Sequence, residues 1–290
     1  MKISVSSYSF AQYIKAGKMT QLDCVSKAKE MGFDAIEFID LDGKPDLEAQ
    51  KEYARKIRNE VDKLGIEINA YTIAASLFNN DKEEMEKEVE RLKGQLEIAD
   101  ILGAKVMRHD ACFKLGKTGA SRSFDLMLPY MAENARKVAE YAKSFGIKTC
   151  VENHGFIAQD SDRVERLFNA VNHENFGLLV DMGNFLCVDE NPAIAVSRVA
   201  PYAIHAHAKD MYISSEPCEK SSHMTRGGNF YGGAVVGEGD VPVKKCLRIL
   251  KAAGYDDYLS IEYEGSEDCI TGIERGLKNL KAMVSEIYGL

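Results

Sequence analysis

The chain has 290 residues, of which 45% are hydrophobic and 28% charged, the composition of an ordinary globular protein with room for one large domain. Its formal net charge of −8 disfavours binding to a nucleic-acid backbone, because phosphate binding requires clustered Lys and Arg. Seven widely spaced cysteines without a C-x-x-C pair, no apolar run of membrane-spanning length and no signal-peptide pattern predict a cytoplasmic protein with reduced thiols and no membrane segment.

Strand and helix patterns alternate along the chain. Side-chain alternation predicts a first strand at residues 3–8, and apolar residues three or four apart then predict a helix that ends near Gly32. The further strands are expected at residues 35–39, 66–71, 105–109, 149–152, 177–181, 203–207 and 259–262. The further helices are expected at residues 47–64, 82–102, up to about 145, 164–171, 193–199, 243–252 and 270–287.

Eight strand–helix units define the expected fold class. Such alternation predicts parallel strands joined by right-handed helical crossovers, and eight units of this total length suit a closed (β/α)8 TIM barrel. An open doubly wound sheet is the alternative, but it usually shows a G-x-G-x-x-G turn after the first strand, and the sequence has none. Without a linker or a shift in composition, we expect residues 1–290 to form a single α/β TIM-barrel domain.

One connection breaks the rhythm. About thirty glycine-rich residues, 211–240, separate the seventh strand from the next helix. In a barrel this segment would lie at the carboxyl-terminal rim, so we expect a long loop that serves as a lid or contacts substrate. A surface excursion without a function is the alternative.

Potential metal ligands stand at the ends of four successive strands, where barrel enzymes build their sites: Glu152, Asp181, His207 and Glu262. Three carboxylates brought together would repel one another unless a cation neutralised them. Carboxylates with one imidazole suit a single divalent ion such as Mn²⁺, with Mg²⁺, Co²⁺ or Zn²⁺ as alternatives. Each residue alone also has a structural explanation, such as a helix cap or turn at Asp181.

Five short stretches in the second half carry a family resemblance: VENHG at 151–155, LVDMGN at 179–184, HAHAKD at 205–210, GEGDV at 237–241 and SIEY at 260–263. Their order resembles the xylose isomerase-like TIM barrel superfamily, which includes sugar phosphate isomerases/epimerases, ketose 3-epimerases, inosose dehydratases and AP endonucleases of family 2. The resemblance implies that Glu152 and Glu262 bind the metal and move the proton. It also implies that Asp181 and His207 complete the ligand set and that Lys209 lies near substrate oxygens.

Two departures from the family pattern narrow the expectation. Asn184 stands where endonuclease IV, which resembles this chain, has a further histidine ligand, and this favours one metal ion over three. The arginine that ketose 3-epimerases carry shortly after the match to His207 is replaced by the sequence Met-Tyr-Ile at 211–213.

These observations predict a metal-dependent sugar isomerase or epimerase. It would abstract a proton next to the carbonyl of a ketose or keto-sugar, with the developing enediolate charge stabilised by the metal. We expect Arg108, His109, His154 and Lys209 to bind substrate hydroxyls. A dehydratase or lyase acting on an inosose or 3-keto-glycoside, alone or as one subunit of a complex, is the first alternative, and a non-catalytic sugar-binding barrel is the second. A homo-oligomer is compatible with either class.

Overall fold

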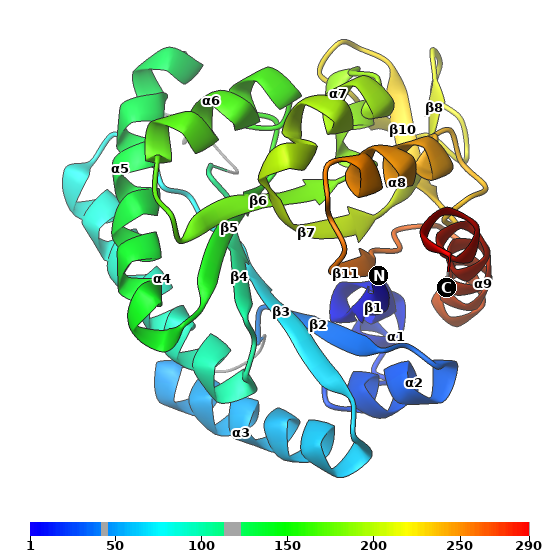
Figure 1. Ribbon diagram of the computed structural model, residues 1–290, viewed down its shortest axis with the longest axis horizontal. Helices are drawn as coiled ribbons and strands as arrows, with labels where there is room; N and C mark the ends of the chain where they lie inside the picture. Colours follow the sequence, from blue (N-terminus) through cyan, green and yellow to red (C-terminus); the bar gives the residue numbers. More distant parts are fainter. Residues whose placement is uncertain (42–45, 113–122, 290) are drawn as a thin grey trace.

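A closed barrel of eight parallel strands forms the centre of the molecule (Figure 1). The computed structural model describes residues 1–41, 46–112 and 123–289. The barrel strands, in the order in which they pair around it, are β1 (Lys2–Ser6), β11 (Tyr258–Ile261), β7 (Ala203–Ala208), β6 (Phe176–Asp181), β5 (Lys148–Glu152), β4 (Val106–His109), β3 (Glu67–Ile73) and β2 (Ala35–Ile39). The predicted single (β/α)8 TIM barrel is confirmed.

Helices form the outer ring of the barrel, as Figure 1 shows. The ring helices are α2 (Asp23–Met31), α3 (Leu47–Leu64), α4 (Lys82–Leu102), α5 (Phe124–Ala142), α6 (Ser161–Val171), α7 (Pro192–Val199), α8 (Val243–Ala252) and α9 (Cys269–Tyr288), and a short helix, α1 (Ala11–Lys15), precedes them in the chain. Short 3-10 turns accompany them: η1 (Ser7–Phe10), η2 (Lys143–Phe145), η3 (Asn184–Val188) and η4 (Ala200–Tyr202). Among the described residues, no helix combines the length and the apolar character that crossing a membrane requires.

The helix ends follow from local chemistry that the sequence already displays. Asp46 and Asp81 cap α3 and α4, because their side chains accept hydrogen bonds from the free backbone N–H groups of the first turn. Gly65 and Gly103 end these helices in the left-handed conformation, with φ of 61° and 75°, which glycine adopts without steric cost. The predicted boundaries of both helices are therefore close to the observed ones.

The parallel register places alternate side chains of each strand inside the barrel. Asp181 of β6 pairs with His207 of β7, and His207 pairs with Ser260 of β11. The side chain of Glu37 on β2 reaches His207 on β7, although β1 and β11 separate these two strands, so this contact crosses the interior. The barrel interior at the carboxyl ends of the strands is therefore lined by buried polar side chains such as these. The apolar core lies between the strands and the helix ring.

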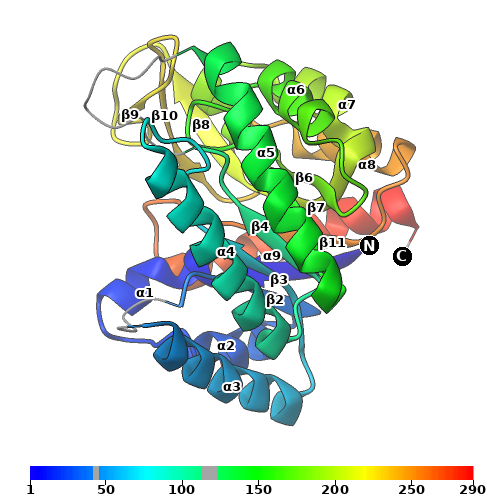
Figure 2. The same ribbon diagram turned by 90° about the vertical axis from the view of Figure 1, so that its left-hand side faces the viewer.

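Two expectations differ from the structure. The segment expected to be a long loop at 211–240 contains a three-stranded antiparallel sheet, made of β8 (Asp210–Ser214), β10 (Phe230–Ala234) and β9 (His223–Met224). We call these three strands the insertion sheet. Figure 2 shows it at one end of the barrel and both chain termini at the opposite end. The first strand also ends at Ser6, because the Ser6 hydroxyl accepts from the N–H of Tyr8 and begins a 3-10 turn.

Candidate active site

Four side chains from successive strands converge at the carboxyl end of the barrel. Each of Glu152, Asp181, His207 and Glu262 offers a ligand atom within 4.8 Å of the others. The Nδ1 atom of His207 lies 3.5 Å from Asp181 Oδ2 and 3.7 Å from both Glu152 Oε1 and Glu262 Oε2. All four residues are buried, so their charges interact in a poorly solvated environment.

The unsatisfied atoms of this cluster fit a metal ion. Among the described residues, Asp181 Oδ2 and His207 Nδ1 have no hydrogen-bond partner, although both atoms are buried. Buried polar atoms without a partner are rare in proteins and call for an explanation. A divalent cation that takes one atom from each of the four side chains would satisfy both.

Asp181 is held by the turn that follows β6. Its Oδ1 accepts hydrogen bonds from the backbone N–H groups of Gly183 and Asn184, both at 2.8 Å, which leaves Oδ2 directed at the other ligands. The backbone of Asp181 is itself tied to the side chain of Asn153 by two hydrogen bonds of 2.9 and 3.0 Å. The turn interpretation of Asp181 and its ligand role are thus compatible, because each uses a different carboxylate oxygen.

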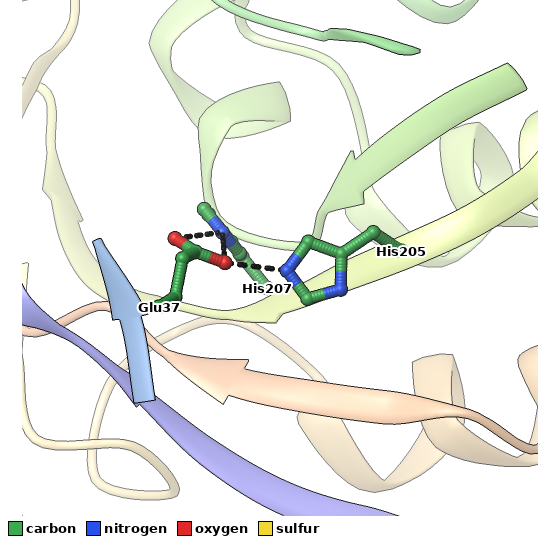
Figure 3. A group of neighbouring side chains, drawn as sticks. All are labelled: Glu37, His205 and His207. Atoms are coloured by element: carbon green, nitrogen blue, oxygen red, sulfur yellow. Dashed lines mark hydrogen bonds and ion pairs between the residues drawn. The ribbon is translucent and has the colours of Figure 1, made fainter. Parts of the chain in front are cut away.

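His207 is oriented by Glu37 (Figure 3). The Nε2 atom of His207 lies 3.0 Å from Glu37 Oε1, and the same carboxylate contacts Nε2 of His205. A histidine that donates from Nε2 to a carboxylate presents Nδ1 as an acceptor, the arrangement typical of metal-binding histidines. Burial alone would raise the pKa of Glu37, but the two imidazoles outweigh it and hold that pKa well below its usual range.

The two glutamates of the cluster have different partners. Glu152 forms an ion pair with Arg108 and accepts a 2.8 Å hydrogen bond from Asn184, whereas Glu262 forms an ion pair with Lys209. Burial raises the pKa of Glu152. Burial also acts to raise the pKa of Glu262, but Lys209 and His207 lower it well below the usual range. Different environments for two facing carboxylates are a common basis for acid and base roles.

Three of the four predicted substrate-binding residues line one cavity beside the cluster. This reaction pocket has a volume of about 220 Å³, and Arg108, His154 and Lys209 lie in its wall with Glu152 and Glu262. Most of the residues that line the pocket are polar or charged, so a ligand held there could form hydrogen bonds with several of them.

His109 is placed elsewhere, and this differs from the prediction. It follows Arg108 on β4, so its side chain points away from the barrel interior. Its Nδ1 lies 3.0 Å from the carbonyl oxygen of Asp110 and its ring packs 6.4 Å from that of Phe176. Burial lowers the pKa of His109 to about 4, so the side chain is neutral near pH 7.

Sequence reasoning did not assign several residues that complete the pocket. Asp110 contacts Arg108 at 2.8 Å and His154 at 2.8 Å, and Glu264 lies 3.5 Å from Lys209. Tyr8 and Glu264 also line the pocket. All three lie one to three residues beyond the end of a barrel strand, and this position was the available signal.

Fold and site together define a (β/α)8 barrel protein with a buried cluster of three carboxylates and one imidazole at the carboxyl ends of its strands. The sequence profile of the xylose isomerase-like TIM barrel family matches residues 25–283. The chain belongs to this family.

The sequence similarity between this chain and a curated relative covers only part of each of the two chains. An inosose dehydratase from Clostridium botulinum is 25% identical over 154 residues, which cover 51% of this chain and 51% of that protein. The chain thus spans about half the length of the curated relatives it matches.

Solved structures share the fold over nearly the full chain. The IOLI protein with a bound zinc atom has a TM-score of 0.74 at 19% identity and covers 100% of both chains. A xylose isomerase-like TIM barrel protein from Mycobacterium smegmatis in complex with magnesium has a TM-score of 0.71 at 18% identity, covering 99% of this chain and 97% of that one. An L-ribulose 3-epimerase has a TM-score of 0.74 at 17% identity, covering 99% and 95%.

Proposed function

We propose that this protein moves a proton at the carbon next to the carbonyl of a ketose or keto-sugar and acts as an isomerase or epimerase. The observation that supports this proposal is the placement of Glu152 and Glu262. Glu152 ends strand β5 and Glu262 directly follows strand β11, and although two other strands separate these strands in the barrel, both side chains line the same small pocket. Each also offers an oxygen to the predicted metal cluster. Substrate oxygens bound there would lie between two carboxylates.

The chain's own residues supply the proton transfers. One glutamate would take the proton from the carbon, and the other would return it to a carbon of the same substrate, which gives epimerisation or isomerisation. Arg108 and Lys209, both almost fully buried, would hold substrate oxygens with charge-assisted hydrogen bonds. Glu152, Asp181, His207 and Glu262 would hold a divalent ion, which would supply Lewis-acid stabilisation of the developing negative charge.

A lyase reaction is the second candidate, and the similarity to an inosose dehydratase favours it. It begins with the same proton abstraction. It differs because the second acid would protonate a leaving hydroxyl or alkoxide on the neighbouring carbon, so that water or an alcohol departs and a double bond forms. An inosose or a 3-keto-glycoside would be a suitable substrate, with the chain alone or as one subunit of a complex.

The test replaces each glutamate by its isosteric amide. We expect Glu152→Gln and Glu262→Gln to lower solvent deuterium incorporation into a ketose by at least about a hundredfold, the usual contribution of a positioned acid or base. Metal content measured on the same samples separates loss of the ion from loss of proton transfer. Glu274→Gln, on the exposed face of α9, is the matched control and should retain activity.

The outcomes separate the candidates. Full deuterium exchange in both variants would refute the acid and base roles. An epimer or isomer in the product spectrum supports the leading proposal, whereas an unsaturated product supports the lyase. A protein that binds sugar but shows neither exchange nor a metal-dependent rise in melting temperature would be the non-catalytic sugar-binding barrel.

A further inference from the structure

A second cavity lies beside the reaction pocket and is lined in part by the insertion sheet. It has a volume of about 370 Å³. Its wall is formed by Glu219, Lys220, Ser222, His223, Tyr231, Gly232, Gly233 and Ser266, together with Tyr8 and Glu264. Tyr8 and Glu264 also line the reaction pocket, so the two cavities are neighbours with these two side chains between them. We call the second cavity the sheet groove.

Two glycines of β10 allow close backbone packing next to the groove. A Cβ atom on Gly233 would lie 2.3 Å from the backbone carbon of Glu264, and one on Gly232 would lie 2.0 Å from the carbonyl oxygen of Lys220. Gly233 also pairs with Gly265 in a parallel bridge. Because Gly233 has no side chain, strand β10 can approach the segment that follows β11 and carries Glu264, and Gly232 likewise allows the backbone of Lys220 to lie against β10.

The chemistry of the groove suits an uncharged polyhydroxylated group. His223 and Tyr231 are cross-strand partners in the insertion sheet, and their rings lie 5.6 Å apart, so together they present an aromatic surface. Ser222 and Ser266 add hydroxyl groups, the charges of Glu219 and Lys220 offset one another, and the Glu264 carboxylate adds an acceptor for hydroxyl donors. The lining of the groove is more polar than apolar, which suits a ligand rich in hydroxyl groups.

The size of the reaction pocket points in the same direction. Its volume of about 220 Å³ is below the roughly 300–1,000 Å³ of typical ligand sites, which leaves room for one sugar ring. A larger substrate would need further space next to it, and the sheet groove is the adjoining cavity.

We propose that the sheet groove is a second subsite that binds a polyhydroxylated group attached to the reacting ketose, such as the second ring of a keto-disaccharide. This inference rests on the proposed function, because it requires the reaction pocket to hold the ketose. Tyr8 and Glu264 would then contact the bond that joins the two rings.

The experiment compares one-ring and two-ring substrates of the manganese-loaded full chain. The probes are 3-keto-glucose and the 3-keto derivatives of maltose, cellobiose, trehalose and sucrose, assayed by solvent deuterium incorporation. His223→Ala and Tyr231→Ala remove the aromatic surface of the groove. Met224→Ala is the matched control, since Met224 follows His223 on β9, is 64% exposed and does not line the groove.

We expect the wild-type protein to prefer at least one two-ring ketose over 3-keto-glucose in kcat/KM. Each groove variant should lower kcat/KM for that two-ring substrate about tenfold, and that for 3-keto-glucose less than about twofold. Met224→Ala should change neither. The inference is overturned if no two-ring ketose is preferred, or if the groove variants lower both substrates equally.

Failure of the proposed function gives a different result. If neither substrate class exchanges deuterium, the catalytic proposal fails, and the subsite is then judged by calorimetric titration with unreactive maltose, cellobiose and glucose. Tighter binding of a disaccharide that His223→Ala abolishes would support the groove as a sugar site. Equal binding of disaccharide and glucose in the wild type and in the variant would reject it.

Discussion

Replacing Glu37 by Gln tests how the structure prepares His207 to bind a metal ion. Glu37 is fully buried and accepts hydrogen bonds from the imidazoles of both His205 and His207. An amide at this position offers one acceptor oxygen and presents an NH₂ group to the second imidazole, so only one ring can keep a hydrogen bond that it donates from Nε2. Loss of such an outer contact typically weakens metal binding by about 10–100-fold.

The expected effect on stability follows from mass action. With free Mn²⁺ at about 100 times the wild-type Kd, the ion stabilises the wild-type protein by about 2.7 kcal/mol. If the Kd rises tenfold or a hundredfold in Glu37→Gln, the same concentration stabilises the variant by only about 1.4 or about 0.4 kcal/mol. The difference corresponds to a melting shift of a few degrees in a domain of this size.

Two assays measure this prediction. Competition with a chromophoric chelator gives the Kd, and thermal unfolding with and without Mn²⁺ gives the stabilisation. Glu274→Gln is the control for loss of one surface carboxylate and should bind the ion as the wild type does. A Glu37→Gln protein that folds and binds Mn²⁺ with unchanged affinity would refute the orienting role of Glu37.

Three further predictions concern other parts of the structure. Asp181→Asn retains an oxygen that can accept from Gly183 and Asn184, so metal content after gel filtration should fall at least about tenfold while the melting temperature in EDTA does not fall. Because burial lowers the pKa of His109 from 6.5 to about 4, the unfolded chain binds the extra proton between these pH values. With respect to His109, the free energy of unfolding is therefore highest above pH 6.5. It falls by about 3 kcal/mol at most as the pH drops to 4. Urea titrations of His109→Asn should therefore show a flatter pH dependence in that window, and an unchanged slope would contradict the prediction. Gly233→Ala should destabilise the protein by about 1–3 kcal/mol because its Cβ would overlap backbone, whereas Gly276→Ala in α9, where the nearest atom is 3.5 Å away, should be neutral or stabilising by up to about 1 kcal/mol. Equal unfolding free energies for the two glycine variants would show that the close approach of β10 does not matter.

Much of the fold could be predicted because its determinants are local. Apolar residues at helical spacing, capping aspartates such as Asp81 and terminal glycines such as Gly103 act within a few residues of chain. The insertion sheet could not be predicted in the same way. Its strands are short, and the glycines of β10 suggest a loop until the backbone of Glu264 is known to lie against them.

The candidate site, like the fold, has a part that the sequence could predict and a part that it could not. Glu152, Asp181, His207 and Glu262 could be selected from the sequence, because parallel strands of a barrel end at one rim and only the residues at those ends needed to be found. His109 was expected to bind substrate as Arg108 does, but adjacent residues of a strand point to opposite faces, and of the two Arg108 lines the reaction pocket.

The sequence by itself determined the alternation of strands and helices and the four residues available to a metal ion. The tertiary structure decided which atoms face one another. It directed Nδ1 of His207 towards the carboxylates through Glu37, a contact between residues 170 positions apart in the chain. It also placed the sheet groove beside the reaction pocket. Distances of this kind depend on barrel closure and register, which no local pattern of residues encodes.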